Sequence, residues 1–346
     1  MALGERVHED LFKDYSFFEC PRNKVAKRLG ADKLLAALEK MLMIRNLETR
    51  AEAAYLQGKV GGFFHSYIGQ EAIQTAIVEV FGTAPWYAAS YRCHALALLL
   101  GATPNEIMAE FYGKKTGNAG GKGGSMHLYT DKLLGGFGIV GGQVPIAIGA
   151  AFANKYRDIP EPAICFLGDG AVAQGAFHES LNLASLWDLP CIIVIENNVW
   201  GMGTRVNRAI SEYPIAEKQA KSYGIESYTI DGTQFLDCYE AFSEMKEKVA
   251  ENGKPILVEV VVERFKGHSV SDPALYREKE DLQKITKCSD PILLLKKHIE
   301  QLGALDEEAF KALDKSCKDI ALEAMKYADS SPWPDPISLE EGVYAE

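Results

Sequence analysis

The sequence predicts an α/β fold with a parallel central sheet. Short apolar runs have the character of buried strands, and a segment of helical length separates the first two. These runs are AICFLG at 163–168, CIIVIE at 191–196 and PILVEVVVER at 255–264, with a helix expected over 175–189. Strands joined through a helix pair in parallel, by right-handed crossovers. Ligands of such sheets bind beyond the carboxyl ends of the strands, where Asp169 and the pair Asn197–Asn198 follow in this chain.

Helical segments are predicted on both sides of this region. Residues 1–30 are expected to form an arm, and apolar residues recur every three or four positions over 31–57, which predicts an amphipathic helix. Further helices are expected over 69–81 and 91–100. From Pro291 the chain is predicted to be helical through Tyr327 and extended after it. We therefore expect one α/β domain over 31–290, with C-terminal helices and a tail over 291–346 packed on it.

A glycine-rich tract lies between the N-terminal helices and the first predicted strand. Residues 113–149 contain 12 glycines in 37 positions, without a repeat. This density is too high for helix or strand, and the tract is too apolar for a linker. We expect backbone that lies close to a ligand or to another chain. A flexible surface loop is the alternative.

Composition excludes several classes of protein. The 346 residues are 47% hydrophobic and 25% charged, with a net charge of −11, which argues against binding nucleic acid through a basic face. The seven cysteines are scattered without a CxxC pair, which favours a reducing compartment. No apolar run approaches the roughly 20 residues of a membrane span. The N-terminus mixes acidic and basic residues without an apolar signal core, so we expect a cytoplasmic protein that does not enter a membrane.

The stretch FLGDGAVAQG at 166–175 has the character of a phosphate-binding loop, but it places Asp169 between its first two glycines. In one interpretation, Asp169 caps the helix that follows. In a second, the loop binds a dinucleotide and Glu196 binds the ribose. Against the second, the GxGxxG spacing is absent, and a carboxylate about 4 Å from a phosphate oxygen costs about 4 kcal/mol at an effective dielectric of 20.

In the third interpretation, a divalent cation lies between Asp169 and the phosphates. Mg²⁺ takes about six oxygen ligands, of which one or two commonly come from carboxylates. The stretch ENNVWG, after the next predicted strand, offers the side-chain oxygen of Asn198 and backbone carbonyls such as that of Trp200. The predicted metal ligands are therefore Asp169, Asn198 and Trp200. We adopt this interpretation because it removes the conflict of charge.

The motif GDG at 168–170 is followed, after 26 residues (171–196), by NN at 197–198. This pattern resembles the signature for thiamine diphosphate and magnesium. Further segments resemble, in order, the alpha chains of thiamine diphosphate-dependent 2-oxo acid dehydrogenases of the pyruvate type, over roughly residues 31–300. The resemblance implies a three-layer thiamine diphosphate-binding fold with helical N- and C-terminal extensions. The segments are GFFHSYIGQEA (62–72), SYRCHALAL (90–98), GKGGSMHLY (121–129), GIVGGQVPIAIGAA (138–151), ENNVWGMGT (196–204) and RFKGHSVSDP (264–273).

The resemblance also implies roles for individual residues. His268 is implied to be catalytic, because it would stabilise and protonate species at the substrate carbonyl, a task suited to a group that titrates near neutrality. His65 is implied as a second catalytic position. His65 and His94 match histidines that line the channel or the cofactor site, with a structural role as the alternative, and His127 is expected to order its loop. Cofactor contacts are implied for Tyr91, Arg92, Gly138, Val140, Asp169, Gly170, Ala171, Asn198, Gly201 and His268.

The resemblance implies partners as well. The cofactor of this family binds between two domains, and the second domain supplies a glutamate that faces the aminopyrimidine ring. The sequence contains the diphosphate-binding half alone, so we expect a separate beta subunit in an alpha₂beta₂ heterotetramer and no activity without it. The implied reaction decarboxylates pyruvate and passes the acetyl group to the lipoyl domain of a dihydrolipoyl acetyltransferase. Acetoin and branched-chain 2-oxo acids are the alternative substrates, and the branched-chain type is disfavoured because GHSVSDP (267–273) replaces its HHSTSDD.

Overall fold

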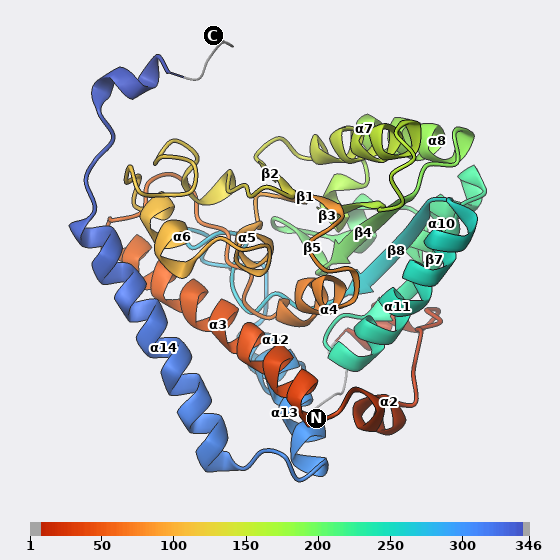
Figure 1. Ribbon diagram of the computed structural model, residues 1–346. Helices are drawn as coiled ribbons and strands as arrows, with labels where there is room; N and C mark the ends of the chain where they lie inside the picture. Colours follow the sequence, from red (N-terminus) through yellow and green to blue (C-terminus); the bar gives the residue numbers. More distant parts are fainter. Residues whose placement is uncertain (1–7, 342–346) are drawn as a thin grey trace.

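A six-stranded sheet lies at the centre of the computed structural model, which describes residues 8–341 (Figure 1). Its strands run in the order β2-β1-β3-β4-β8-β7, and all neighbouring pairs are parallel. This confirms the predicted α/β class. A short antiparallel ribbon, β5 with β6, follows β4. The strands are β1 Trp86–Ser90, β2 Leu133–Phe137, β3 Ala163–Gly168, β4 Cys191–Asn197, β5 Trp200–Gly201, β6 Thr204–Arg205, β7 Glu226–Asp231 and β8 Ile256–Val261.

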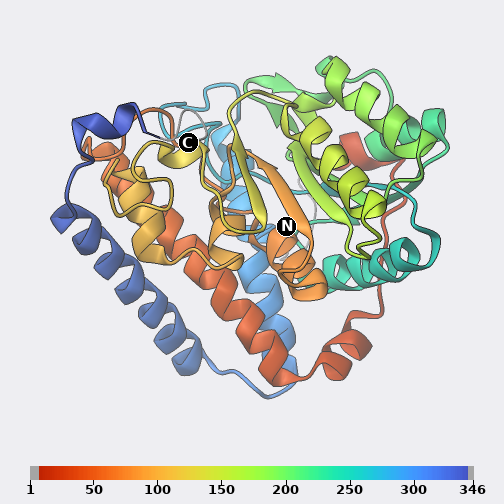
Figure 2. The same cartoon turned by 45° about the horizontal axis from the view of Figure 1, so that its top comes forward.

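Helices cover both faces of the sheet and make the architecture three-layered (Figures 1 and 2). One face carries α7, α8 and α10; the other carries α4 and α11, with α3, α13 and α14 outside them. The helices are α1 Glu9–Phe12, α2 Arg22–Leu29, α3 Ala31–Leu56, α4 Glu71–Phe81, α5 His94–Leu99, α6 Pro104–Phe111, α7 Gln143–Tyr156, α8 Gly175–Leu186, α9 Val206–Ala209, α10 Ile215–Tyr223, α11 Phe235–Asn252, α12 Lys279–Cys288, α13 Pro291–Gln301 and α14 Glu307–Ser330.

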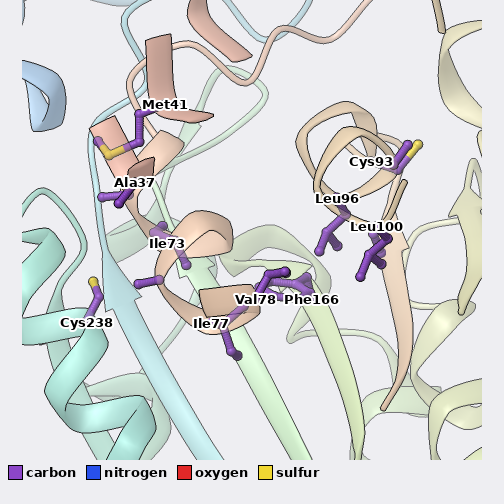
Figure 3. Packing of buried hydrophobic residues seen from close by; sticks show 14 of the residues in the cluster. Ala37, Met41, Ile73, Ile77, Val78, Cys93, Leu96, Leu100, Phe166 and Cys238 are labelled. Carbon is purple, nitrogen blue, oxygen red and sulfur yellow. The ribbon is translucent and has the colours of Figure 1, made fainter. Parts of the chain in front are cut away.

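Two hydrophobic cores form because side chains alternate along each strand. In β3, Ile164 and Phe166 belong to the core beneath α4 and α11, whereas Cys165 and Leu167 belong to the core beneath α7 and α8. Figure 3 shows Phe166 beside α4 in the first of these cores. The inner strands β3, β4 and β8 are therefore apolar over most of their length, since both of their faces are buried.

The glycine-rich tract is more regular than predicted. We expected neither helix nor strand over 113–149, and this was wrong, because β2 and the first half of α7 lie within it. In β2 the need for glycine comes from close packing: a Cβ on Gly136 would lie 2.4 Å from both the Cys93 Sγ and the Met126 carbonyl oxygen. Glycine here allows a strand to approach its neighbours rather than preventing a strand.

The remaining differences concern boundaries and the two ends of the chain. The predicted helix over 91–100 begins at His94, and the C-terminal helical region is broken between α13 and α14. The predicted arm contains α1 and α2, and its Phe18 forms a bridge to Ile230 of β7. After α14 the tail includes one 3-10 turn over Pro336–Leu339. Residues 1–7 of the arm and 342–346 of the tail lie outside the described residues.

Candidate functional site

The candidate site lies at the carboxyl edge of the sheet, where the strand order reverses. From β1 the chain continues to β2 on one side, and from β3 it continues to β4 on the other. Open α/β sheets bind ligands at such a reversal. The segments that leave the carboxyl ends here are Gly138–Gly142 after β2, Tyr91–Arg92 after β1, Asp169–Ala171 after β3 and Asn198–Gly201 after β4.

A cavity of about 630 Å³ opens between these segments. It is lined by every residue that the sequence predicted for a catalytic, cofactor-binding or metal-binding role. His65 enters from the segment before α4, and His268 from the loop after β8. The predicted residues that line the cavity are His65, Tyr91, Arg92, Gly138, Val140, Asp169, Gly170, Ala171, Asn198, Trp200, Gly201 and His268.

Asp169 is buried with a carboxylate oxygen that has no partner. Its side chain is 2% exposed, and among the described residues its Oδ2 atom has no hydrogen-bond partner. Burial raises the pKa of Asp169 to about 6, and Arg264 and the backbone N–H groups of Asp169 and Asn198 act in the opposite direction. A buried carboxylate oxygen left without a donor is costly. The position therefore fits a ligand that accepts an oxygen lone pair, such as a cation.

The two other predicted cation ligands lie beside the Asp169 loop. The ribbon strand β5 packs against Asp169–Ala171, so the turn that carries Asn198 and Trp200 faces the acid. The Asn198 side-chain NH₂ donates to the Oε1 atom of Gln70 over 3.4 Å, and both residues line the cavity. Within the described part of the chain, no three His, Cys, Asp or Glu side chains gather as a metal-binding group. A cation here would therefore take most of its ligands from amide, carbonyl, phosphate and water oxygens, as Mg²⁺ does.

Arg264 is a residue of this site that the sequence interpretation missed. It is 1% exposed, and its guanidinium donates to the Trp200 carbonyl over 3.2 Å and to the Asn198 Oδ1 atom over 3.5 Å. Burial lowers the pKa of Arg264 to about 10, and the neighbouring Arg92 contributes to this shift. A signal was present, because Arg264 stands four residues before His268, in the quoted segment RFKGHSVSDP.

Glycines set the width of the cavity floor. A Cβ on Gly170 would lie 3.3 Å from the Cα of Gly201, and a Cβ on Gly138 would lie 3.1 Å from the Nε2 atom of His127. Both distances are tighter than ordinary side-chain contacts. The backbone can therefore approach a ligand at these positions, which is one reason for glycine at such places.

His268 lies between two guanidinium groups. Its Nδ1 atom is 3.5 Å from Arg92 Nη2 and 3.5 Å from Arg264 Nη1, and its Nε2 atom is 3.3 Å from the Tyr91 hydroxyl. Arg92 also donates to the His268 carbonyl over 2.6 Å. Burial, then Arg92 and Arg264, lower the pKa of His268 to about 3. We expected a group that titrates near neutrality; in the surroundings that the chain provides, the ring is neutral because a positive charge would meet two others.

His65 completes a group of rings above the cavity. Its ring centre is 5.0 Å from that of His268 and 4.3 Å from that of Tyr91. Burial, then Arg92 and His268, lower the pKa of His65 to about 2, and its Nδ1 atom has no hydrogen-bond partner among residues 8–341. The arrangement of His65, Tyr91, Arg92, Arg264 and His268 is suited to binding an anion.

The other two histidines that the sequence singled out lie outside the cavity lining. His94 is 2% exposed; its Nδ1 atom is 2.9 Å from Glu48 and its Nε2 atom 2.8 Å from the Ser125 carbonyl. His94 therefore joins α3 to the loop around Ser125, in the structural role that was the alternative. The His127 Nδ1 atom is 3.0 Å from the Gly123 carbonyl, an arrangement that suits the expected ordering of its loop.

Comparisons with known proteins agree with this geometry. The model of the family described as "Dehydrogenase E1 component" matches residues 39–337. The chain is 41% identical to "Pyruvate dehydrogenase E1 component subunit alpha" of Rickettsia conorii, over 90% of this chain and 96% of the relative. The protein of the same name from Rhizobium meliloti is 39% identical over 88% of both chains. The mitochondrial protein of Schizosaccharomyces pombe is 36% identical over 99% of this chain and 82% of its own. The chain belongs to the dehydrogenase E1 component family.

Proposed function

We propose that this chain is the alpha subunit of a thiamine diphosphate-dependent pyruvate dehydrogenase and that it binds thiamine diphosphate through Mg²⁺. The observation that carries the proposal is the buried carboxylate oxygen of Asp169, which lacks a partner among the described residues and faces a cavity lined by Arg92 and His268. A cation beside Asp169 and a polyanion beside Arg92 would satisfy both charges at once.

Asp169, Asn198 and the Trp200 carbonyl would hold the cation, and Gly170, Ala171 and Gly201 would lie against the diphosphate. When bound, thiamine diphosphate supplies the electron sink for decarboxylation of a 2-oxo acid. The chain's own contribution is to bind and orient. Gly138 and Val140 would contact the aminopyrimidine side through their backbone.

Arg92 and Tyr91 would position His268 as well as the diphosphate. Arg92 holds the backbone of His268 through its 2.6 Å hydrogen bond, and the Tyr91 hydroxyl faces the His268 Nε2 atom. An anion beside Arg92 would offset the positive charge that now lowers the pKa of His268. The ring could then hold and donate a proton at Nε2 toward the substrate, with His65 beside it.

A beta subunit would close the cavity. Exposed apolar side chains stand in its lining, among them Phe63, Val140 and Met202. A further apolar face extends over the carboxyl-terminal ends of α7 and α8, where Phe152 packs on Trp187 with ring centres 5.5 Å apart. Exposed apolar patches of this kind mark contacts with other chains. We assign them to an alpha₂beta₂ heterotetramer, whose beta subunit supplies the glutamate for the aminopyrimidine ring.

Pyruvate is the substrate that we propose, with the lipoyl domain of a dihydrolipoyl acetyltransferase as the acceptor of the acetyl group. The names of the relatives favour pyruvate over acetoin and branched-chain 2-oxo acids. Among residues 8–341, no helix has both the length and the apolar character that crossing a bilayer requires. Cys20, Cys93, Cys165, Cys191, Cys238 and Cys317 carry free thiols, which supports a reducing compartment, and we propose the cytoplasm.

Two experiments test the proposal. Calorimetry of the full chain with thiamine diphosphate, with and without Mg²⁺, should show binding that depends on the metal; equal binding without a divalent cation would contradict it. Co-expression with the beta chain should then give decarboxylation of pyruvate in preference to acetoin and to branched-chain 2-oxo acids. Robust turnover by the purified chain alone would refute the requirement for a partner.

A further inference from the structure

The turn that presents Asn198 and Trp200 has an unfavourable backbone conformation at its centre. Val199, between them, has a φ of 72°. This left-handed region is rare for residues other than glycine and is a genuine outlier for a β-branched residue such as valine. Such a conformation persists only where the surrounding structure imposes it. The neighbouring Asn197, to which the site described above assigns no role, hydrogen-bonds to this turn, and the Val199 carbonyl also accepts the N–H of Val206 over 2.7 Å.

The Asn197 side chain makes two hydrogen bonds, one to the backbone of this turn and one to the neighbouring strand β8. It is the last residue of β4 and is fully buried. Its Oδ1 atom accepts the backbone N–H of Val199 over 3.0 Å, which closes a tight turn around Asn198. Its Nδ2 atom donates to the Oε1 atom of Glu259 over 2.7 Å. The amide is therefore held in one orientation, since the two hydrogen bonds require its oxygen on one side and its nitrogen on the other.

Glu259 is in turn fixed from two further directions. It is fully buried on β8, the strand next to β4. Its Oε1 atom also accepts the hydroxyl of Tyr15 over 2.8 Å, and its Oε2 atom accepts the Ala216 N–H over 3.1 Å. The donors come from β4, from α10 and from the N-terminal arm. Each of the two carboxylate oxygens thus has a donor, in contrast to Asp169.

We infer that Asn197 is a positioning residue for the proposed cation site: anchored by Glu259 and Tyr15, it holds Val199 in the left-handed conformation and so directs Asn198 and the Trp200 carbonyl toward Asp169. The inference rests on the proposed function, because it concerns the ligands of the proposed cation. It gives the first asparagine of the pair Asn197–Asn198 a task distinct from that of the second. It also connects the N-terminal arm to the site through a chain of three hydrogen bonds.

The test compares Asn197→Ala with Asn154→Ala in the full chain. Asn154 is a matched control, because it is a buried asparagine whose Nδ2 atom donates to the Glu161 carbonyl over 2.7 Å, in α7 and outside the cavity lining. The probe is Mn²⁺, whose binding in the presence of thiamine diphosphate is followed by electron paramagnetic resonance. The midpoint of urea unfolding without ligands is measured in parallel. We expect both variants to lose stability, but only Asn197→Ala to bind Mn²⁺ about tenfold more weakly or worse.

Val199→Gly separates positioning from a general loss of stability. Glycine adopts positive φ without help, so the turn no longer needs Asn197 in this background. The loss of Mn²⁺ affinity caused by Asn197→Ala should then shrink to less than about threefold. If Asn197→Ala fails to fold, Tyr15→Phe replaces it, because this variant removes one hydroxyl and keeps the shape of the side chain. We expect Tyr15→Phe to weaken Mn²⁺ binding about two- to threefold.

The outcomes are distinct. Wild-type binding of Mn²⁺ together with unchanged binding by Asn197→Ala would overturn this inference and leave the proposed function intact. An equal loss of affinity in the Val199→Gly background would also overturn it, since the turn would not be the route of the effect. If the wild-type chain binds no Mn²⁺ with thiamine diphosphate, then both the proposed cation site and its positioning residue are rejected.

Discussion

Two buried acids beside glycine-rich loops meet opposite surroundings in this molecule. Glu110, near the end of α6, accepts four backbone N–H groups from the loop over 119–124: from Ala119 and Gly121 on Oε2, at 2.8 Å each, and from Gly123 and Gly124 on Oε1, at 2.7 and 3.0 Å. Asp169, in the loop after β3, keeps an oxygen without a donor among the described residues. Both carboxylates are buried.

The difference separates a completed structural contact from a site that requires a ligand. Glu110 organises the glycine-rich loop with charge-assisted hydrogen bonds and leaves no capacity for anything else. Asp169 bears the cost of burial, and the folded chain offers it no full compensation. A glycine-rich loop can therefore donate its N–H groups to an acid of the chain itself, or it can carry an acid whose free oxygen is available to bind a cation.

The sharpest test of this comparison is Asp169→Asn. We expect decarboxylation by the complex with the beta chain to fall at least about 1000-fold, because the amide cannot replace the carboxylate on the cation. The ligand-free chain should become no less stable in urea, since the variant removes a buried charge. Activity within about tenfold of the wild type would break the comparison, because Asp169 would then be a structural acid like Glu110.

Glu110→Gln should act in the opposite way. The variant places an NH₂ group against backbone donors, so we expect the free energy of unfolding to fall by about 3 kcal/mol in urea titrations. Glu106→Gln in the same helix is the control, because Glu106 is only partly buried and takes part in a capping box with Thr103. We expect Glu106→Gln to lower the free energy of unfolding by about 1 kcal/mol or less. Equal losses would mean that the buried carboxylate contributes nothing beyond an ordinary cap.

Ligands should distinguish the two acids by stabilisation. At about 100 times the dissociation constant, Mg²⁺ with thiamine diphosphate should add about 2.7 kcal/mol to the unfolding free energy. We expect this increment in the wild type and in Glu110→Gln, although the free energy of unfolding without ligands is lower in Glu110→Gln. Asp169→Asn should show almost none of it. Thermal unfolding with and without ligands measures the increment, and its persistence in Asp169→Asn would place the cation elsewhere.

The smallest expected effect concerns the cationic side of the site. The pKa values of His65 and His268 are lowered to about 2 and about 3, from an ordinary value of 6.5. Their neutral forms contribute stability that is present above pH 6.5 and lost as the pH falls through the window below it, by at most about 1.4 kcal/mol per pH unit for each ring. We measure the free energy of unfolding in urea at pH 5 and at pH 7.5. The difference between the two values should be smaller for His268→Gln than for the wild type. An unchanged difference would mean that His268 is not neutralised by its surroundings.

Much of this site was predictable because its residues follow buried strands. The apolar runs that became β3 and β4 placed Asp169 and Asn198 at one edge, and the charge of Asp169 beside glycines indicated a cation. The strands β1 and β7 and the helices α10 and α11 were not predicted. In the tract 113–149, the high glycine content concealed β2, since Gly136 serves a close contact that no local pattern reveals.

The sequence alone determined that the runs of β3, β4 and β8 are buried and that a helix separates the first two, because hydrophobic periodicity is a property of neighbouring residues. It also determined that Asp169 and Asn198 leave adjacent strands. Only the tertiary structure decided the partners of each polar group: Arg264 with Trp200, Glu110 with its loop, and Tyr15 with Glu259, 244 residues apart in the chain. Hydrogen bonds between such distant residues depend on how helices and strands pack, and no local signal specifies them.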